Sequence, residues 1–242
     1  MDVLPFHAVH VDLLRTDDPT ALARLDAYRL LLTDDEQARM ARFVFEKDRR
    51  AFLLTRALVR TTLSRYAAVA PADWRFIANT HGRPDIADRP AGVPDLRFNL
   101  SHTNGLIACA VTMEREVGVD VEHVQRVLTH DIASRFFAPS EVEDLHALPA
   151  SEQARVFFDY WTLKESYIKA RGFGLALPLG DFAFTLHPDK APTIRFEPSL
   201  PDDPESWQFA QDWPTPDHRL AVAVRRHGAD LPVRIRTVVP PA

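Results

Sequence analysis

The segment that most constrains this chain is the hexapeptide VGVDVE at residues 117–122. Its three valines alternate with Gly118, Asp120 and Glu122, which predicts a strand with one apolar and one polar face. The two carboxylates then lie on the polar face about 7 Å apart, and they repel each other unless a proton or a cation lies between them. Mg²⁺ binds through one or two carboxylates together with substrate phosphates. The hexapeptide therefore predicts a metal–phosphate site or, as the alternative, the solvated outer face of an antiparallel strand.

Length and composition favour a globular cytoplasmic protein. A chain of 242 residues is long for one ordinary domain and short for two large ones. Residues 1–10 contain acid and no apolar run, so we expect no secretory signal, and no stretch approaches the 18 or so apolar residues of a membrane span. Cys109 is the only cysteine, which excludes internal disulfides and fits a reducing compartment. The net charge of −5 argues against general nucleic-acid binding.

Hydrophobic periodicity predicts helix followed by strands once in each half of the chain, near 1–115 and 116–242, without an internal sequence repeat. Residues 1–14 are expected to contain a strand, and 85–95 an irregular surface loop. The apolar strand at 106–113 is expected to form a hairpin with the 117–122 strand through Glu114-Arg115-Glu116. A helix is predicted to start at Ala138-Pro139-Ser140-Glu141. Further strands are expected at 74–77, 98–102, 182–186, 193–196, 207–210, 220–224 and 233–239.

The helical segment at residues 34–66 is unusually basic for an acidic chain. Arg56 and Arg60 are four residues apart and therefore lie on one helix face, and Arg49 lies about two turns before Arg56. Such a concentration of guanidinium groups is able to bind phosphate. The alternative is an ordinary solvated helix face.

The strongest predicted helix covers residues 151–170 and ends before Gly172 and Gly174. Phe157, Trp161, Glu165 and Lys169 are spaced by four and form one stripe, and a second apolar stripe runs beside it. A helix that is apolar on more than one side is expected to be buried. Glu165 and Lys169 are then either a simple pair of opposite charges, or functional residues. In the second case Glu165 is the third carboxylate of a metal site and Lys169 lies beside the phosphate.

The ordered motifs resemble those of the 4′-phosphopantetheinyl transferases of the longer, single-chain type. The motifs are Gly82-Arg83-Pro84, Phe98-Asn99-Leu100-Ser101-His102, the hexapeptide at 117–122, Arg135-Phe136-Phe137 with Glu141, and WTLKESYIKA at 161–170. The resemblance implies an α+β fold of two similar subdomains related by a pseudo-twofold axis, each a mostly antiparallel sheet packed with a long helix. Residues 1–115 would form the coenzyme A 3′-phosphate side, and residues 116–242 the metal and catalytic side.

The same resemblance implies the reaction. The phosphopantetheine arm of coenzyme A would be transferred to a serine of an apo acyl or peptidyl carrier protein, releasing adenosine 3′,5′-bisphosphate. Mg²⁺, with Mn²⁺ as an alternative, would be held by Asp120, Glu122 and Glu165. Glu165 would also accept the serine proton, and Lys169 would stabilise the leaving bisphosphate. The residues implied in coenzyme A binding are Arg50, Arg56, Arg83, Ser101, His102 and Lys169.

Some positions depart from the family pattern. Glu36 lies where some relatives have a basic contact to coenzyme A, so the arginine set is expected to be rearranged, with Arg39 near a position that is often basic. Arg83 replaces a frequent lysine, and the role of Glu141 is open between supporting and catalytic. Two other classes remain: a metal-dependent nuclease, and a coenzyme A-binding protein without catalysis. We expect a monomer, with neither nucleic acid nor a membrane as partner.

Overall fold

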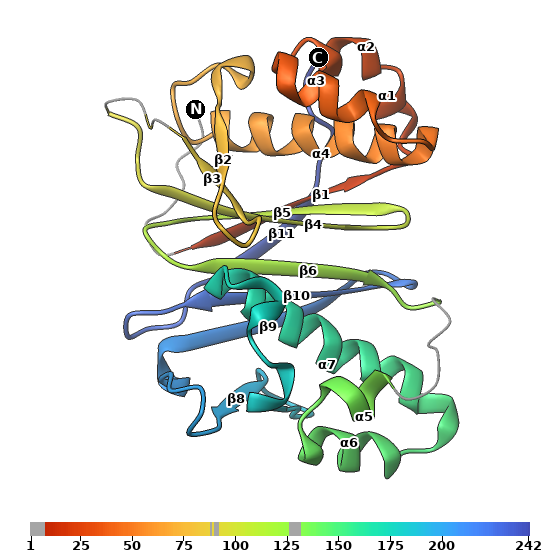
Figure 1. The fold of residues 1–242 in the computed structure, drawn as a ribbon, viewed down its shortest axis with the longest axis vertical. Helices are drawn as coiled ribbons and strands as arrows, with labels where there is room; N and C mark the ends of the chain where they lie inside the picture. Colours follow the sequence, from red (N-terminus) through yellow and green to blue (C-terminus); the bar gives the residue numbers. More distant parts are fainter. Residues whose placement is uncertain (1–7, 88, 90–91, 126–131) are drawn as a thin grey trace. The chain divides into compact units, whose positions relative to one another are not determined.

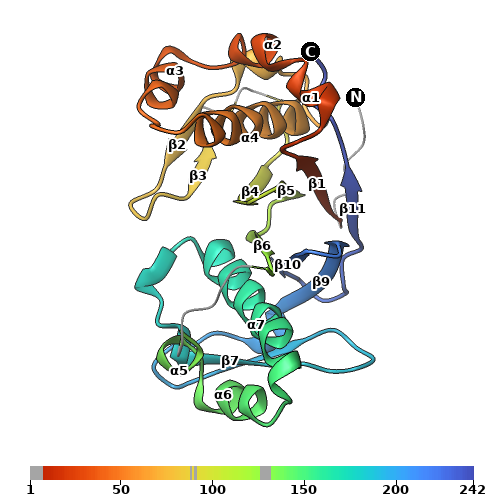
Figure 2. The same cartoon turned by 90° about the vertical axis from the view of Figure 1, so that its right-hand side faces the viewer.

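The computed structural model describes the chain except for residues 1–7, 88, 90–91 and 126–131. The chain divides into two compact units (Figures 1 and 2). Unit 1 comprises Met1–Asn79, Pro84–Glu114 and Pro232–Ala242, and unit 2 comprises Thr80–Arg83 and Arg115–Leu231. A single division near residue 115 would place the turn at 80–83 in unit 1 and the C-terminal segment in unit 2. In the structure the turn belongs to unit 2, and Pro232–Ala242 belongs to unit 1.

Unit 1 is built on a four-stranded sheet with the order β11-β1-β5-β4. Strand β1 pairs in parallel with β11 and antiparallel with β5, and β5 also pairs antiparallel with β4. The long helix α4 packs on this sheet (Figure 2). Its leucines join the sheet residues in one core. The elements are β1 (Val9–Arg15), α1 (Pro19–Leu22), α2 (Leu25–Arg29), α3 (Asp34–Ala41), α4 (Glu46–Ser64), β2 (Phe76–Ala78), β3 (Pro84–Ile86), β4 (Leu96–Thr103), β5 (Leu106–Met113) and β11 (Val233–Thr237).

Unit 2 contains a three-stranded antiparallel sheet with the order β6-β10-β9 and a separate hairpin of β7 and β8. Its long helix α7 packs on β6 and β10 (Figure 1). An aromatic-rich core lies around the helix. The elements are β6 (Val117–His123), α5 (Ile132–Phe136), α6 (Pro139–His146), α7 (Ala150–Arg171), β7 (Phe182–Thr185), β8 (Thr193–Phe196), β9 (Trp207–Thr215) and β10 (His218–Arg225).

The predicted α+β class is confirmed: in each unit a mostly antiparallel sheet packs against one long helix. The pseudo-twofold relation between the units stays a prediction. Helix α7 ends where the glycines predicted it, because Gly172 adopts a left-handed conformation (φ 71°) that favours glycine. The basic segment at 34–66 forms two helices, α3 and α4, with a break at residues 42–45. In the described part of the chain no helix is both long and apolar enough to cross a bilayer.

The predicted hairpin between the 106–113 and 117–122 strands is wrong. Strand β5 pairs with β1 and β4, whereas β6 pairs with β10 along its whole length, from Val117 to His123. The connecting residues are instead the passage from unit 1 to unit 2, and Glu114 has a positive φ of 56° there. Short sequence separation favoured the hairpin, but the partner of β6 lies about a hundred residues further along the chain.

Candidate active site

The polar face of β6 is covered by helix α7. A Cβ atom added to Gly118 would lie closer than 3.0 Å to the Ser166 carbonyl oxygen and to the Ala170 backbone nitrogen. Only a residue without a side chain permits this approach of strand and helix. Asp120, two residues further along β6, is only 4% exposed. The alternative of a solvated strand face is therefore wrong for this segment.

Replacing Gly118 with alanine is expected to lower the free energy of unfolding by about 3 kcal/mol, because the added methyl group meets the backbone of α7 and not a flexible side chain. Gly180→Ala is the matched control, since nothing lies within 4 Å of its added Cβ. Urea denaturation of the two variants measures the difference. Equal stabilities would contradict the close packing of α7 on β6.

Four charged side chains lie within electrostatic range of one another where α7 covers β6. The Lys169 ammonium donates to Asp120 Oδ1 over 2.6 Å. Burial, together with the negative charges of Asp120 and Glu122, raises the pKa of Glu165 from its ordinary 4.5 to about 7, although the positive charge of Lys169 opposes the shift. The two acids of the strand and the acid and lysine of the helix therefore lie within electrostatic range of one another.

The raised pKa of Glu165 predicts a pH-dependent stability. The pKa of this carboxyl is higher in the folded state than in the unfolded chain, so the folded state binds the proton more tightly. The stabilisation is complete below about pH 4.5 and is lost as the pH rises through about 7. In metal-free buffer at pH 8.5, we expect Glu165→Gln to be more stable than the parent by on the order of 2 kcal/mol, with the difference vanishing towards pH 5.

Denaturation curves recorded from pH 5 to 8.5 check this expectation. Glu152→Gln, a change at an exposed position in the first turn of α7, is the control and should follow the parent at every pH. A Glu165→Gln curve that runs parallel to the parent would contradict the crowding of acids around Glu165.

The chemistry of these side chains suits a hard divalent cation, which prefers carboxylate oxygens, and the carboxylates come from two regular elements, β6 and α7. Among the described residues, no three His, Cys, Asp or Glu side chains are already arranged around a common point. The Lys169 ammonium lies against Asp120 instead. A cation in this site would be held by Asp120, Glu122 and Glu165, and it would offset the negative charges of Asp120 and Glu122 that, after burial, contribute to the raised pKa of Glu165.

A buried ion pair that the sequence did not reveal holds α7 in place. Lys164 and Glu141 are fully buried, with 2.7 Å between Nζ and Oε2. Lys164 also donates to the carbonyl oxygens of Leu179 and Phe182. Glu141 accepts from two backbone nitrogens, those of Ala138 at the start of α6 and Phe184 in β7. Glu141 thus joins α6, α7 and β7, which is a structural role for the residue whose function was open.

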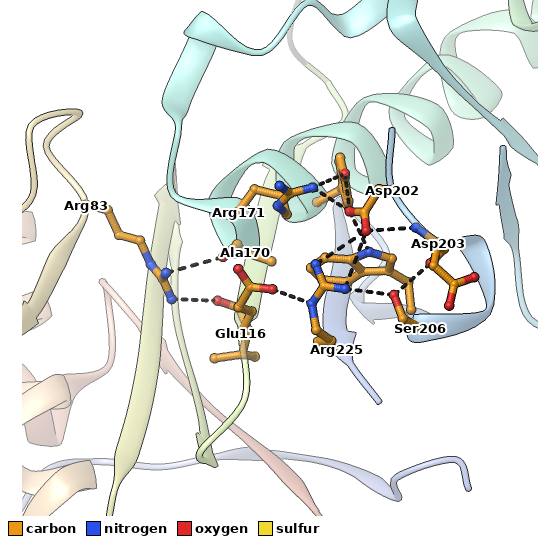
Figure 3. Close-up of polar contacts among 11 residues, drawn as sticks. Arg83, Glu116, Ala170, Arg171, Asp202, Asp203, Ser206 and Arg225 are labelled. Carbon is orange, nitrogen blue, oxygen red and sulfur yellow. Dashed lines mark hydrogen bonds and ion pairs between the residues drawn. The ribbon is translucent and has the colours of Figure 1, made fainter. Parts of the chain in front are cut away.

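The C-terminal end of α7 is held by a second polar network (Figure 3). Asp202 accepts from Arg171, the last residue of α7, from the Tyr167 hydroxyl at 2.8 Å and from the Trp207 indole at 3.0 Å. Arg225 of β10 donates to Glu116 and, at 2.8 Å, to Ser206. Through Arg171 and Tyr167, Asp202 holds the last turn of α7, which includes Lys169. The sequence predicted a strand beginning at Trp207, but it did not predict that Asp202 would join Arg171, Tyr167 and Trp207.

The basic face of α4 is an ion-pair cluster and not a solvated surface. Glu36 of α3 lies 2.5 Å from Arg60 and 3.3 Å from Arg56, which confirms that the two arginines share a face. The Arg60 side chain is completely buried, and it also donates to the carbonyl oxygens of Pro71 and Trp74. Burial lowers the pKa of Arg56, while the charge of Glu36 raises it. Both guanidinium groups lie over the Phe76 ring.

The predicted site residues are divided between the two units. Arg83, Asp120, Glu122, Glu165 and Lys169 belong to unit 2, whereas Arg50, Arg56, Ser101 and His102 belong to unit 1. In unit 1, Ser101 is buried and His102 exposed at the end of β4, and Arg50 is half-buried on α4. Arg39 is exposed, with its guanidinium 5.6 Å from the centre of the Phe52 ring.

Comparison with known proteins identifies the family. Residues 116–223 match the model of the 4′-phosphopantetheinyl transferase superfamily, and residues 18–114 match a model of the N-terminal part of a 4′-phosphopantetheinyl transferase. The 4′-phosphopantetheinyl transferase HetI of Nostoc sp. is 34% identical over 221 residues, covering 91% of this chain and 89% of the relative. The chain belongs to the 4′-phosphopantetheinyl transferases.

Other relatives agree with this membership. The 4′-phosphopantetheinyl transferase Sfp of Bacillus subtilis is 32% identical over 206 residues, covering 85% of this transferase and 88% of the relative. Among solved structures, the holo-[acyl-carrier-protein] synthase of Thermotoga maritima matches 46% of this chain and 62% of its own, with 23% identity and a TM-score of 0.38. Because its family membership rests on the family models and on relatives at least 30% identical, the protein is an enzyme of this class, which sets aside the nuclease and the non-catalytic binding protein.

Proposed function

We propose that this transferase moves the 4′-phosphopantetheine arm of coenzyme A to a serine of an apo acyl or peptidyl carrier protein, in a reaction that depends on Mg²⁺ and releases adenosine 3′,5′-bisphosphate. Family membership supports the class of reaction. The observation that supports the chemistry most directly is the meeting of Asp120, Glu122, Glu165 and Lys169 where α7 covers β6.

A divalent cation, when bound, supplies positive charge that stabilises the phosphate oxygens as the bond to the leaving group breaks. Asp120, Glu122 and Glu165 would hold it. Mn²⁺ suits the same oxygen ligands and is expected to substitute for Mg²⁺. The Lys169 ammonium donates to Asp120 in this structure. During the reaction it would instead donate to an oxygen of the leaving bisphosphate and offset the negative charge that develops there.

Glu165 is the group proposed to accept the proton of the carrier serine. In the metal-free site the pKa of Glu165 is about 7, near the pH at which a general base both is ionised and binds a proton well. The same carboxylate is a proposed metal ligand, and ligation lowers its basicity. Glu165→Asp retains a ligand but withdraws it from the serine, so comparison of metal affinity and transfer rate in this variant separates the two roles.

Unit 1 is proposed to supply the contacts to the 3′-phosphate and the adenine of coenzyme A. Arg50 and Arg56 of α4 would bind the phosphate, and Ser101 and His102 at the end of β4 would donate to phosphate oxygens. Glu36 already accepts from the guanidinium of Arg60 and lies beside Arg56. Two arginines therefore share one acid, which leaves the cluster with a net positive charge for an anion.

We infer further that the transferase acts as a cytoplasmic monomer, without nucleic acid or membrane as partner. The complete set of proposed metal ligands comes from one chain, so catalysis needs no second copy. Size-exclusion chromatography combined with an activity assay of the eluted peak tests this expectation, and activity confined to a dimer peak would contradict it.

Mass spectrometry of an apo carrier protein tests the proposed function. The carrier is incubated with coenzyme A, Mg²⁺ and the transferase, and a gain the size of one phosphopantetheine is expected on a single serine. A panel of acyl and peptidyl carriers is used, because the pathway served is not specified. The absence of this gain on every carrier would overturn the proposal, and its loss on omitting Mg²⁺ is the expected control.

A further inference from the structure

We propose that Arg83 is a positioning residue for the transfer reaction, whose guanidinium joins the C-terminal turn of α7 to strand β6 and thereby sets where Lys169 lies beside Asp120. This inference rests on the proposed function for its kinetic consequences. Its structural part, the attachment of α7 to β6, is independent of that function.

The arrangement is a fork between two elements (Figure 3). Arg83 Nη1 donates to the carbonyl oxygen of Ala170 in α7 at 3.2 Å, and Nη2 donates to the carbonyl oxygen of Val117 in β6 at 3.3 Å. One planar guanidinium therefore contacts both the helix and the strand. A lysine ammonium is a single point on a flexible stem and does not present two donors in a fixed geometry.

Both acceptors are carbonyl groups that regular secondary structure leaves available. Ala170 is the second-last residue of α7, and the last four carbonyls of a helix have no partner within it and favour a cation. In β6, the neighbouring Glu116 carbonyl accepts from the Arg225 nitrogen on the β10 side. The next carbonyl along the strand, that of Val117, faces the opposite way and accepts from Arg83.

The fork acts at the point of closest approach between helix and strand. Ala170 and Ser166 are the α7 residues whose backbone lies against Gly118, and Gly118 follows Val117 directly. Lys169 precedes Ala170 directly, and Asp120 lies two residues after Gly118. The Lys169 ammonium donates to Asp120 over 2.6 Å. A displacement of the last turn of α7 therefore changes the position of Lys169 relative to Asp120.

The turn that presents Arg83 is itself built onto unit 2. Gly82 has a φ of 84°, a conformation that favours glycine, and it turns the chain between His81 and Arg83. The His81 ring packs edge-on against Phe173, just beyond the end of α7, with 5.8 Å between ring centres. Arg83 is thus the last residue of a four-residue segment, Thr80–Arg83, that belongs to unit 2.

This role differs from the one that the family resemblance implies for Arg83, which is contact with coenzyme A. A ligand contact lowers the KM for coenzyme A, whereas a positioning residue affects the chemical step. Arg83→Met is therefore expected to reduce kcat roughly 100-fold, as a misplacement of about 1 Å does, and to change the KM for coenzyme A by less than about twofold. Arg83→Lys should recover part of the rate, since it keeps a single donor.

Arg75→Met is the matched control. Arg75 is an exposed arginine that also donates to two backbone carbonyl oxygens, those of Ala72 and Trp74, but these lie in its own segment and join no distant elements. Its kcat and KM are expected to equal those of the parent. A fall in kcat for both arginine variants would show that loss of any carbonyl contact slows the enzyme, and would overturn the specific role of Arg83.

Hydrogen exchange tests the structural part without any substrate. In Arg83→Met, the amides at residues 166–172 of α7 and its cap are expected to exchange faster, while those at 153–160 keep the parent rate. Unchanged exchange at 166–172 would overturn the proposal, as would a raised KM at parent kcat. If the parent transfers nothing to any carrier, the proposed function fails and the exchange result alone decides the role of Arg83. If Arg83→Met does not fold, Arg83→Lys gives the same comparison.

Discussion

Asp120→Asn is expected to lower the transfer rate by on the order of 1,000-fold or more, because a metal-bound phosphoryl transfer owes several kcal/mol of its barrier reduction to the ion. The amide keeps the shape of the side chain and removes the charge that pairs with Lys169 and would hold the cation. Phosphopantetheine incorporation into an apo carrier, followed over time by mass spectrometry, measures the effect.

The loss should not come from unfolding. Asp120→Asn still accepts from the Lys169 ammonium with its amide oxygen, so the circular dichroism spectrum and the melting midpoint are expected to stay close to those of the parent. Asp189→Asn, at an exposed position between β7 and β8, is the control and should transfer at the parent rate. Near-normal turnover by a folded Asp120→Asn variant would remove Asp120 from the metal site.

Lys164→Met is expected to lower the free energy of unfolding by about 3 to 5 kcal/mol, since it leaves the Glu141 carboxylate buried without its partner. Burial already raises the pKa of Glu141 and lowers that of Lys164 to about 8, so each charge depends on the other. Urea denaturation at pH 7 measures the loss. It is the largest stability effect expected of any single substitution considered for this protein.

The double variant Glu141→Gln with Lys164→Met distinguishes a pair from two independent residues. Removing both charges should restore part of the stability, so the two single losses should not add. Asp17→Asn, which breaks an ion pair whose side chains are 54% and 63% exposed, is the control and should cost less than about 1 kcal/mol. Additive losses in the double variant would contradict the coupling of Lys164 and Glu141.

Local patterns were sufficient to find the strand and the helix that form the candidate site in unit 2. Alternation in the hexapeptide at 117–122 predicted which residues of β6 share a face, and spacing by four in α7 predicted that Glu165 and Lys169 lie together. Each pattern reports the geometry of one element. The contact between Lys169 and Asp120 joins residues 49 positions apart, and the sequence did not predict it. The family resemblance implied only that Asp120 and Glu165 bind one metal ion, with Lys169 beside the leaving bisphosphate.

The features that local patterns missed depend on tertiary contacts. From the sequence alone, Lys164 and Arg60 look like ordinary solvated helix residues. Both are fully buried, and each forms an ion pair with an acid from another segment. Gly118 was recognised as lacking a side chain, but the reason, the backbone of α7 against it, needed the structure. The pairing of β6 with β10 likewise spans about a hundred residues, whereas the predicted hairpin relied on proximity in sequence.

Titration of Mn²⁺ into the transferase tests most directly that three carboxylates from β6 and α7 act on one divalent ion. Isothermal calorimetry of the parent in the presence of coenzyme A is expected to show one strong site, and Asp120→Asn, Glu122→Gln and Glu165→Gln should each weaken it by at least about tenfold. Binding of the ion at parent affinity in all three variants would contradict the account.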